Sequence, residues 1–168
     1  LDQTISYAVV DRAIRNDDGV FHWYSDRKTS FNHNYYWYEE PIKKKIHIIP
    51  WDLDNAFENI TGENPVTYIP DRWGEISNNC EPFSYGEWEI YQRSASCDKI
   101  IKVWSSYLEE YKTLQNKLAD SYVDEASRLI DKWSIQIKEA TLKASELHDD
   151  AITIKKWERN VGILKAQI

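Results

Sequence analysis

Residues 48–57 read Ile48-Ile49-Pro50-Trp51-Asp52-Leu53-Asp54-Asn55-Ala56-Phe57, an apolar run that leads directly into two acidic residues at positions i and i+2. Because successive side chains of a strand point to opposite faces, Asp52 and Asp54 would share one face if the strand continues. Carboxylates at a strand end suit hard cations such as Mg²⁺, and hard cations in turn suit phosphate groups. This segment therefore points to phosphoryl chemistry.

A β-hairpin is predicted around this segment. The aromatic run Tyr35-Tyr36-Trp37-Tyr38 favours a strand. Residues 39–44 carry Glu, Pro and Lys and predict a turn, and residues 45–49 predict the return strand. Because a hairpin places its two ends side by side, Asn34 is expected to lie near Asp52.

Helices are predicted at both ends of the chain. Residues 3–16 form an amphipathic pattern that closes with Asn16-Asp17-Asp18-Gly19, where Gly19 is the expected left-handed stop. Apolar residues recur at helical spacing through residues 99–168, which predicts a helical layer packed under the hairpin. Residues 20–33 are expected to form an irregular loop. Residues 58–98 are expected to be mostly loop, because they carry many Gly and Pro residues.

Composition limits the class of protein. With 168 residues, of which 42% are hydrophobic, the chain is long enough for a single domain over residues 1–168. The formal net charge of −7 argues against a nucleic-acid partner, because a nucleic-acid groove needs a basic face. No apolar run approaches the ~20 residues that a membrane-spanning helix needs.

The two cysteines, Cys80 and Cys97, flank a polar, aromatic segment. They lack the spacing of a zinc site. Two interpretations are open: a disulfide that closes this segment, or two free thiols in a reducing cytosol. A disulfide would favour the cell surface, a spore coat or an extracellular setting.

Acidic and amide side chains follow each other in a suggestive order. A helix end carries Asp17 and Asp18, a loop leads to Asn34, and the hairpin leads to Asp52. Phosphotransferases of the protein-kinase type use a similar order, in which one Asp serves the acceptor hydroxyl while an Asn and a second Asp bind metal.

The local sequence closely resembles the spore-coat protein H (CotH) kinase family. Three stretches carry the resemblance: Asn16-Asp17-Asp18 at a helix end, Asn34 to Tyr38 as an "NYYLY"-like strand, and Pro50 to Phe57 as an "IPWDLD…F" strand end. The clear resemblance covers roughly residues 3–60, and the helical tail matches more loosely. The Pro-Trp-Asp-Leu-Asp motif is the specific part.

The resemblance implies an atypical protein kinase, a transferase that moves phosphate from ATP to serine side chains of a protein substrate. It implies an α+β fold, namely a kinase-like C-terminal lobe that is mostly helical with a hairpin carrying a site for Mg²⁺ (or Mn²⁺). Carried over by position, Asp18 matches the catalytic Asp, with Asp17 as the adjacent alternate. Asp52 matches the metal-binding Asp and Asn34 the Asn that assists nucleotide and metal binding, with Asp54 as a further metal ligand.

The chain departs from the family pattern in two places. In the family, the Asn follows the catalytic Asp after only a few residues, so pairing Asp18 with Asn34 requires residues 19–33 to bulge outward. A kinase also needs an N-terminal lobe with a phosphate-binding Lys, which Leu1 and Asp2 do not supply. The expected partners are therefore this lobe, outside the chain, and the protein substrate.

Two other functions compete with a kinase. The first is a catalytically silent surface or adhesion module of the same family. The second is a carbohydrate-binding domain, in which tryptophans such as Trp23 or Trp37 would stack on sugars, although most Trp residues in a domain of this size are expected in the core. His22 and His33 flank the predicted site and are expected to be surface or hydrogen-bonded residues, with phosphate binding as the alternative.

Overall fold

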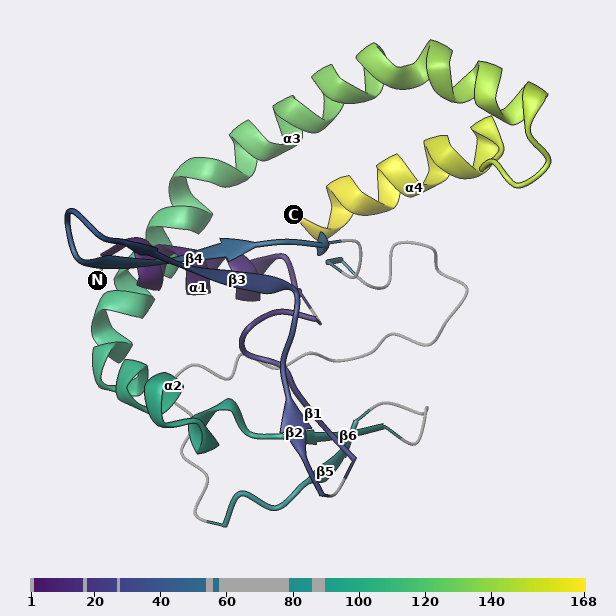
Figure 1. Cartoon of the computed structure of the whole chain (residues 1–168). Helices are drawn as coiled ribbons and strands as arrows, with labels where there is room; N and C mark the ends of the chain where they lie inside the picture. The colour runs from purple at the N-terminus through teal and green to yellow at the C-terminus, as the bar shows by residue number, and fades with distance from the viewer. Residues whose placement is uncertain (1, 17, 27, 54–55, 58–78, 86–89) are drawn as a thin grey trace. The chain divides into compact units, whose positions relative to one another are not determined.

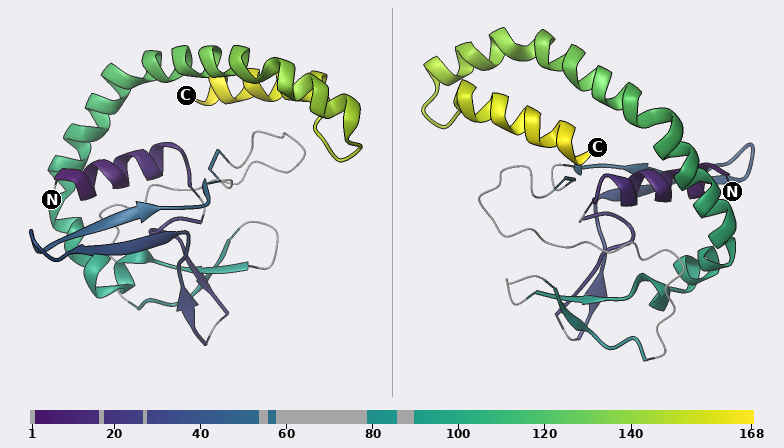
Figure 2. Two further views of the ribbon diagram at one scale, coloured as in Figure 1. Left: turned by 45° about the horizontal axis from the view of Figure 1, so that its top comes forward. Right: turned by 180° about the vertical axis from the view of Figure 1, so that it is seen from behind.

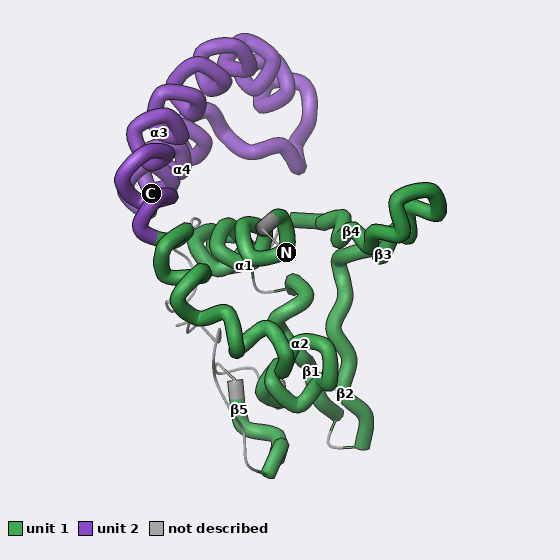
Figure 3. Tube along the Cα trace, turned by 90° about the vertical axis from the view of Figure 1, so that its left-hand side faces the viewer, with its two compact units in different colours: residues 1–58, 65–115 green, residues 59–64, 116–168 purple. Residues whose placement is uncertain are grey.

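The computed structural model describes residues 2–16, 18–26, 28–53, 56–57, 79–85 and 90–168. These residues form helices and short antiparallel strands, which confirms the α+β class (Figure 1). The chain divides into two compact units (Figure 3). Unit 1 comprises Leu1–Glu58 and Pro65–Gln115, and unit 2 comprises Asn59–Asn64 and Asn116–Ile168. The single domain over residues 1–168 stays a prediction.

Helix α1 (Asp2–Ala13) opens unit 1. It buries Ile5, Ala8 and Val9, which share one face because they lie three and four residues apart. The helix ends earlier than the predicted residue 16, because Arg15 adopts the left-handed conformation with φ 51°. Gly19 does not adopt that conformation, so the prediction that it stops the helix is wrong.

The predicted hairpin is confirmed. Strand β3 (Tyr35–Glu40) pairs antiparallel with β4 (Lys45–Pro50), in a register that sets Tyr35 opposite Pro50 and Glu40 opposite Lys45. The hairpin lies beside α1 in both views of Figure 2. Its large apolar side chains remain substantially exposed, including Trp37, which is 46% exposed and therefore not a core residue.

A four-stranded sheet forms where loop was predicted. Strands β1 (Trp23–Ser25) and β2 (Ser30–Phe31) lie within residues 20–33, and β5 (Phe83–Tyr85) and β6 (Ile90–Arg93) lie within residues 58–98. The order is β2-β1-β6-β5, with all pairs antiparallel. The loop predictions are wrong for these residues, since pairing of β1 with the distant β6 is a tertiary contact that local sequence does not reveal.

The core of unit 1 lies where α1, the segment after it and the region after β6 meet. Its buried apolar residues outside α1 are Val20, Phe21, Ala95, Ile101 and Tyr111. The ring of Phe21 also meets that of Trp104 edge-on, at a centroid distance of 5.6 Å.

Unit 1 also contains short helical elements after β6 and a disulfide. The elements are η2 (Ala95–Cys97), α2 (Lys99–Trp104) and η3 (Ser105–Tyr107). The Asp98 side chain caps α2 by accepting hydrogen bonds from the backbone N–H groups of Ile100 and Ile101. Cys80 and Cys97 are joined with Cα atoms 5.8 Å apart, which confirms the disulfide and rules out the free-thiol interpretation.

The predicted helices at the end of the chain are confirmed as α3 (Leu108–Leu147) and α4 (Ile154–Gln167). The side chain of Thr153 caps α4 by accepting a hydrogen bond from the backbone N–H of Lys156. Packing of these helices under the hairpin stays a prediction. Across the described residues, no helix combines the length and the apolar character needed to cross a membrane.

Candidate active site

The C-terminal end of α1 contains a buried polar network. Asp11 and Arg12 are 2% and 8% exposed, and their side chains form an ion pair at 2.6 Å. Arg12 also donates to the backbone carbonyl of Asn16 at 2.8 Å, and Asn16 donates to Oδ1 of Asp11 at 2.8 Å. The Tyr7 hydroxyl donates to the same oxygen at 3.3 Å, and burial, together with the charge of Asp11, raises the pKa of Tyr7.

His22 extends this network to the sheet. Nη1 of Arg12 lies 2.7 Å from Nε2 of His22, and because a guanidinium only donates, Nε2 is the acceptor. Nδ1 of His22 lies 3.0 Å from Nε2 of the side-chain amide of Gln92 on β6. His22 is thus a buried, hydrogen-bonded residue that fixes the segment after α1 against β6.

The buried polar network leaves no space for a side chain at position 19, so Gly19 is required there. A Cβ atom at Gly19 would lie 2.6 Å from Nδ2 of Asn16 and 2.6 Å from Oδ1 of Asp11. Both atoms belong to buried side chains that are already hydrogen-bonded to each other. The segment that carries Asp18 therefore passes directly over the buried polar network, and only glycine fits there.

Asp18 is contacted by residues from two places in the chain. Its Oδ1 accepts a hydrogen bond from the Tyr24 hydroxyl at 2.6 Å and lies 3.6 Å from Nε2 of His33. Its Oδ2 accepts from Nδ2 of Asn34 at 3.4 Å. Strands β1 and β2 lie between Asp18 and Asn34 in the sequence, and Asn34 nevertheless contacts Asp18.

Asn34 connects Asp18 with the end of the hairpin. Its backbone carbonyl accepts a hydrogen bond from the N–H of Trp51 at 3.1 Å, and its Nδ2 donates to the backbone carbonyl of Asp52 at 3.3 Å. Asn34 and Asp52 both have positive φ, 60° and 53°. Asn tolerates this conformation better than most residues, and such backbone strain is typical of functional sites.

The structure thus brings together three of the predicted site residues, Asp18, Asn34 and Asp52. Asp17 and Asp54 lie outside the described residues. Within the described ranges, no group of three or more His, Cys, Asp or Glu side chains is arranged to hold a metal ion. The residues brought together here include two that carry carboxylates, Asp18 and Asp52, and one that carries an amide, Asn34.

Sequence reasoning missed Tyr24 and Gln92. Both lie in segments predicted as loop, and both gain their role from pairing of β1 with β6, which aligns Tyr24 with Gln92. The adjacent aromatic residues Trp23 and Tyr24 were the available signal for a strand.

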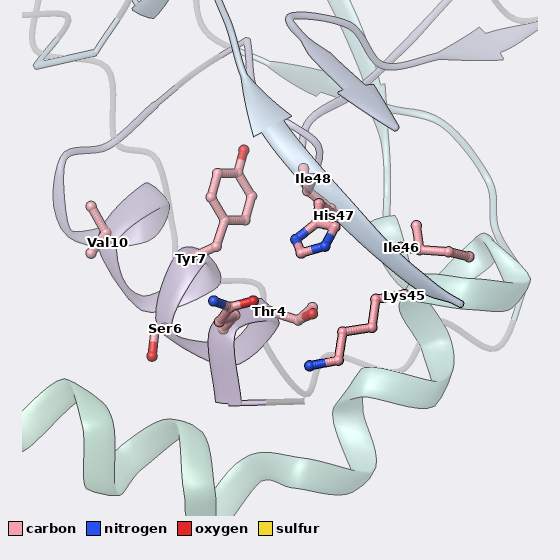
Figure 4. Close-up of a pocket in the computed structure, with 9 residues that line it drawn as sticks. Thr4, Ser6, Tyr7, Val10, Lys45, Ile46, His47 and Ile48 are labelled. Atoms are coloured by element: carbon pink, nitrogen blue, oxygen red, sulfur yellow. The ribbon is translucent and has the colours of Figure 1, made fainter. Parts of the chain in front are cut away.

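A separate groove lies between α1 and β4 (Figure 4). Its volume is about 810 Å³, and the residues around it include Tyr7, Lys45 and His47. Neither Asp18, Asn34 nor Asp52 is among the residues that line it. The groove is therefore distinct from the cluster around Asp18.

A family model described as CotH kinase protein matches residues 1–168. The match extends over the whole chain, beyond the stretch of residues 3–60 on which the resemblance rests. No curated protein and no solved structure matches the chain.

Proposed function

The chain belongs to the CotH kinase protein family, and we propose that it forms the catalytic lobe of an atypical kinase that transfers phosphate from ATP to serine side chains of a protein. The observation that carries this proposal is the contact of Asn34 with both acidic positions. Its amide reaches the carboxylate of Asp18 and the backbone of Asp52, which come from opposite ends of a segment of more than 30 residues.

The donor set suits a hard cation that accompanies the nucleotide. Asp52 supplies a carboxylate on the exposed end of the hairpin, and Asn34 would supply its amide oxygen while its Nδ2 keeps the contacts with Asp18 and Asp52. Asp54 would add a carboxylate. A bound Mg²⁺ or Mn²⁺ would neutralise charge on the β- and γ-phosphates.

Asp18 acts on the acceptor. The donors on its two oxygens fix the plane of the carboxylate that would accept the proton of the serine hydroxyl. As the serine Oγ attacks the γ-phosphorus, the new O–P bond forms and the bond to the β,γ-bridging oxygen breaks. Asp18 takes up the serine proton and later releases it to water, leaving phosphoserine and ADP.

The test is Mg²⁺-dependent transfer of the γ-phosphate by the purified full-length protein to itself or to serine-containing peptides. Asp18→Asn and Asp52→Asn are each expected to lower kcat by roughly 10²–10³-fold. Mg²⁺-dependent ATP binding should be lost in Asp52→Asn and retained in Asp18→Asn. Asp124→Asn, on the exposed face of α3, is the matched control and should behave as the wild type.

Unchanged transfer in both site variants would refute the assigned roles. The absence of any ATP turnover by the wild type would favour a second function, a catalytically silent binding module. The observation that favours this module is the exposed hairpin, where Tyr36, Trp37 and Tyr38 are 58%, 46% and 51% exposed. Partner binding by such a module would survive Asp52→Ala.

We place the protein at the cell surface or outside the cell. The disulfide between Cys80 and Cys97 supports this placement, because disulfides persist mainly in oxidising compartments.

A further inference from the structure

The segment between Asp18 and Asn34 is built into the sheet of unit 1. Strand β1 pairs with β2 on one side and with β6 on the other, as Figure 1 shows. Tyr24, at the centre of β1, is aligned with Phe31 on β2 and with Gln92 on β6. Its backbone position is therefore fixed by two neighbouring strands.

The side chain of Tyr24 is fixed as well. Its ring packs against those of Phe31 and His33, at centroid distances of 6.3 Å and 5.4 Å, and Phe31 and His33 pack on each other at 6.2 Å. This aromatic cluster aims the hydroxyl of Tyr24 at Oδ1 of Asp18.

The hydrogen bond from Tyr24 to Asp18 is shorter than the contacts of Asp18 with Asn34 and His33. At 2.6 Å it has the length of a charge-assisted O–H···O⁻ bond, whereas the contacts of Asp18 with Asn34 and His33 measure 3.4 Å and 3.6 Å. The Asp18 side chain is 13% exposed, so it is held largely by its protein neighbours. Tyr24 therefore has a stronger influence on the orientation of the carboxylate than Asn34 or His33.

We propose that Tyr24 is a positioning residue for catalysis, which holds the Asp18 carboxylate in the plane that receives the acceptor hydroxyl. This inference rests on the proposed function. Strands β1 and β2 would then serve catalysis. They lie in the segment between Asp18 and Asn34, and β1 places the hydroxyl group of Tyr24 against Asp18. Tyr24 itself makes no contact with the substrate in this role.

The test compares Tyr24→Phe with Tyr35→Phe in the full-length protein. Both variants keep the ring and lose one hydroxyl hydrogen bond, since the Tyr35 hydroxyl donates to Oδ1 of Asn32 at 3.0 Å. Tyr24→Phe should lower kcat for phosphate transfer by about tenfold to a hundredfold, as expected for a misplaced catalytic group. The KM for ATP should stay within about twofold, because Tyr24 acts on Asp18 rather than on Asp52.

A double-mutant cycle separates positioning from a structural effect. In the Asp18→Ala background, Tyr24→Phe should cause no further loss of kcat, because the group that it positions is gone. An equal loss of kcat in Tyr24→Phe and Tyr35→Phe, or a full additional loss in the Asp18→Ala background, would overturn the inference. These outcomes leave the proposed function intact, whereas a wild type without Mg²⁺-dependent transfer refutes the proposed function and the inference together.

Discussion

The two compact units bury their side chains very differently. Within the described residues of unit 1, apolar side chains from α1, the segment after it and α2 are buried, and so is the polar network around Arg12. In unit 2, none of residues 116–168 is buried, and Trp133 and Ile137, expected to pack in a helical layer, are about half exposed. Unit 1 therefore has a buried core, whereas the helices of unit 2 are held by partly exposed apolar side chains, helix caps and ion pairs.

This difference explains why the candidate active site lies in unit 1. A catalytic group must be held to within about half an ångström, which requires neighbours whose own positions are fixed. Asp18 has such neighbours in Tyr24 and Asn34, and Asn16, two residues before it, is hydrogen-bonded to Asp11 and Arg12. A pair of helices without buried side chains opens more easily and would not hold that geometry.

The largest effect is expected from breaking the buried ion pair. Asp11→Ala leaves the Arg12 guanidinium buried without its carboxylate, which should lower the free energy of unfolding by about 3–5 kcal/mol. The measurement is urea unfolding of the purified protein. Asp124→Ala, an exposed Asp on α3, is the control and should change the unfolding free energy by no more than about 0.5 kcal/mol. Equal effects of the two variants would remove the contrast between the units.

The parts of unit 1 that the sequence predicts are those set by neighbours along the chain. The hairpin followed from the strand-forming run at Tyr35 and the turn after it, and the approach of Asn34 to Asp52 followed from the hairpin. The parts that it does not predict depend on distant contacts. The pairing of Tyr24 with Gln92 spans most of unit 1, and Gly19 is needed for space beside Asp11 rather than for its backbone angles.

The second effect concerns the disulfide, whose cysteines both lie in unit 1. Replacing Cys80 and Cys97 by Ser removes a disulfide whose cysteines are 17 residues apart in the sequence. The double replacement should lower the free energy of unfolding by about 3 kcal/mol. Hydrogen exchange read by mass spectrometry should show faster exchange in β6 and unchanged exchange in α4. Reductant should reproduce the effect in the wild type and add nothing in the double variant. Faster exchange in both elements would mean that the two units unfold together.

A smaller effect is expected in unit 2, at the start of α4. Thr153→Ala removes the side-chain acceptor for the N–H of Lys156 and should destabilise the helix by about 1 kcal/mol. The measurement is hydrogen exchange at the N-terminal end of α4. Thr153→Ser keeps the hydroxyl and should restore most of the protection. Equal exchange in the Ala and Ser variants would show that the cap contributes nothing.

The smallest effect is expected from an ion pair between α3 and α4. Nζ of Lys165 lies 2.7 Å and 2.8 Å from the two carboxylate oxygens of Asp131, which is half exposed. A double-mutant cycle with Lys165→Ala and Asp131→Ala should give a coupling of about 0.2–1 kcal/mol, because exposed pairs lose most of their Coulomb energy to solvent. The coupling should fall as salt is added. A coupling of several kcal/mol that resists salt would mean that this face of unit 2 is shielded from water in solution, and the contrast with unit 1 would then have to be abandoned.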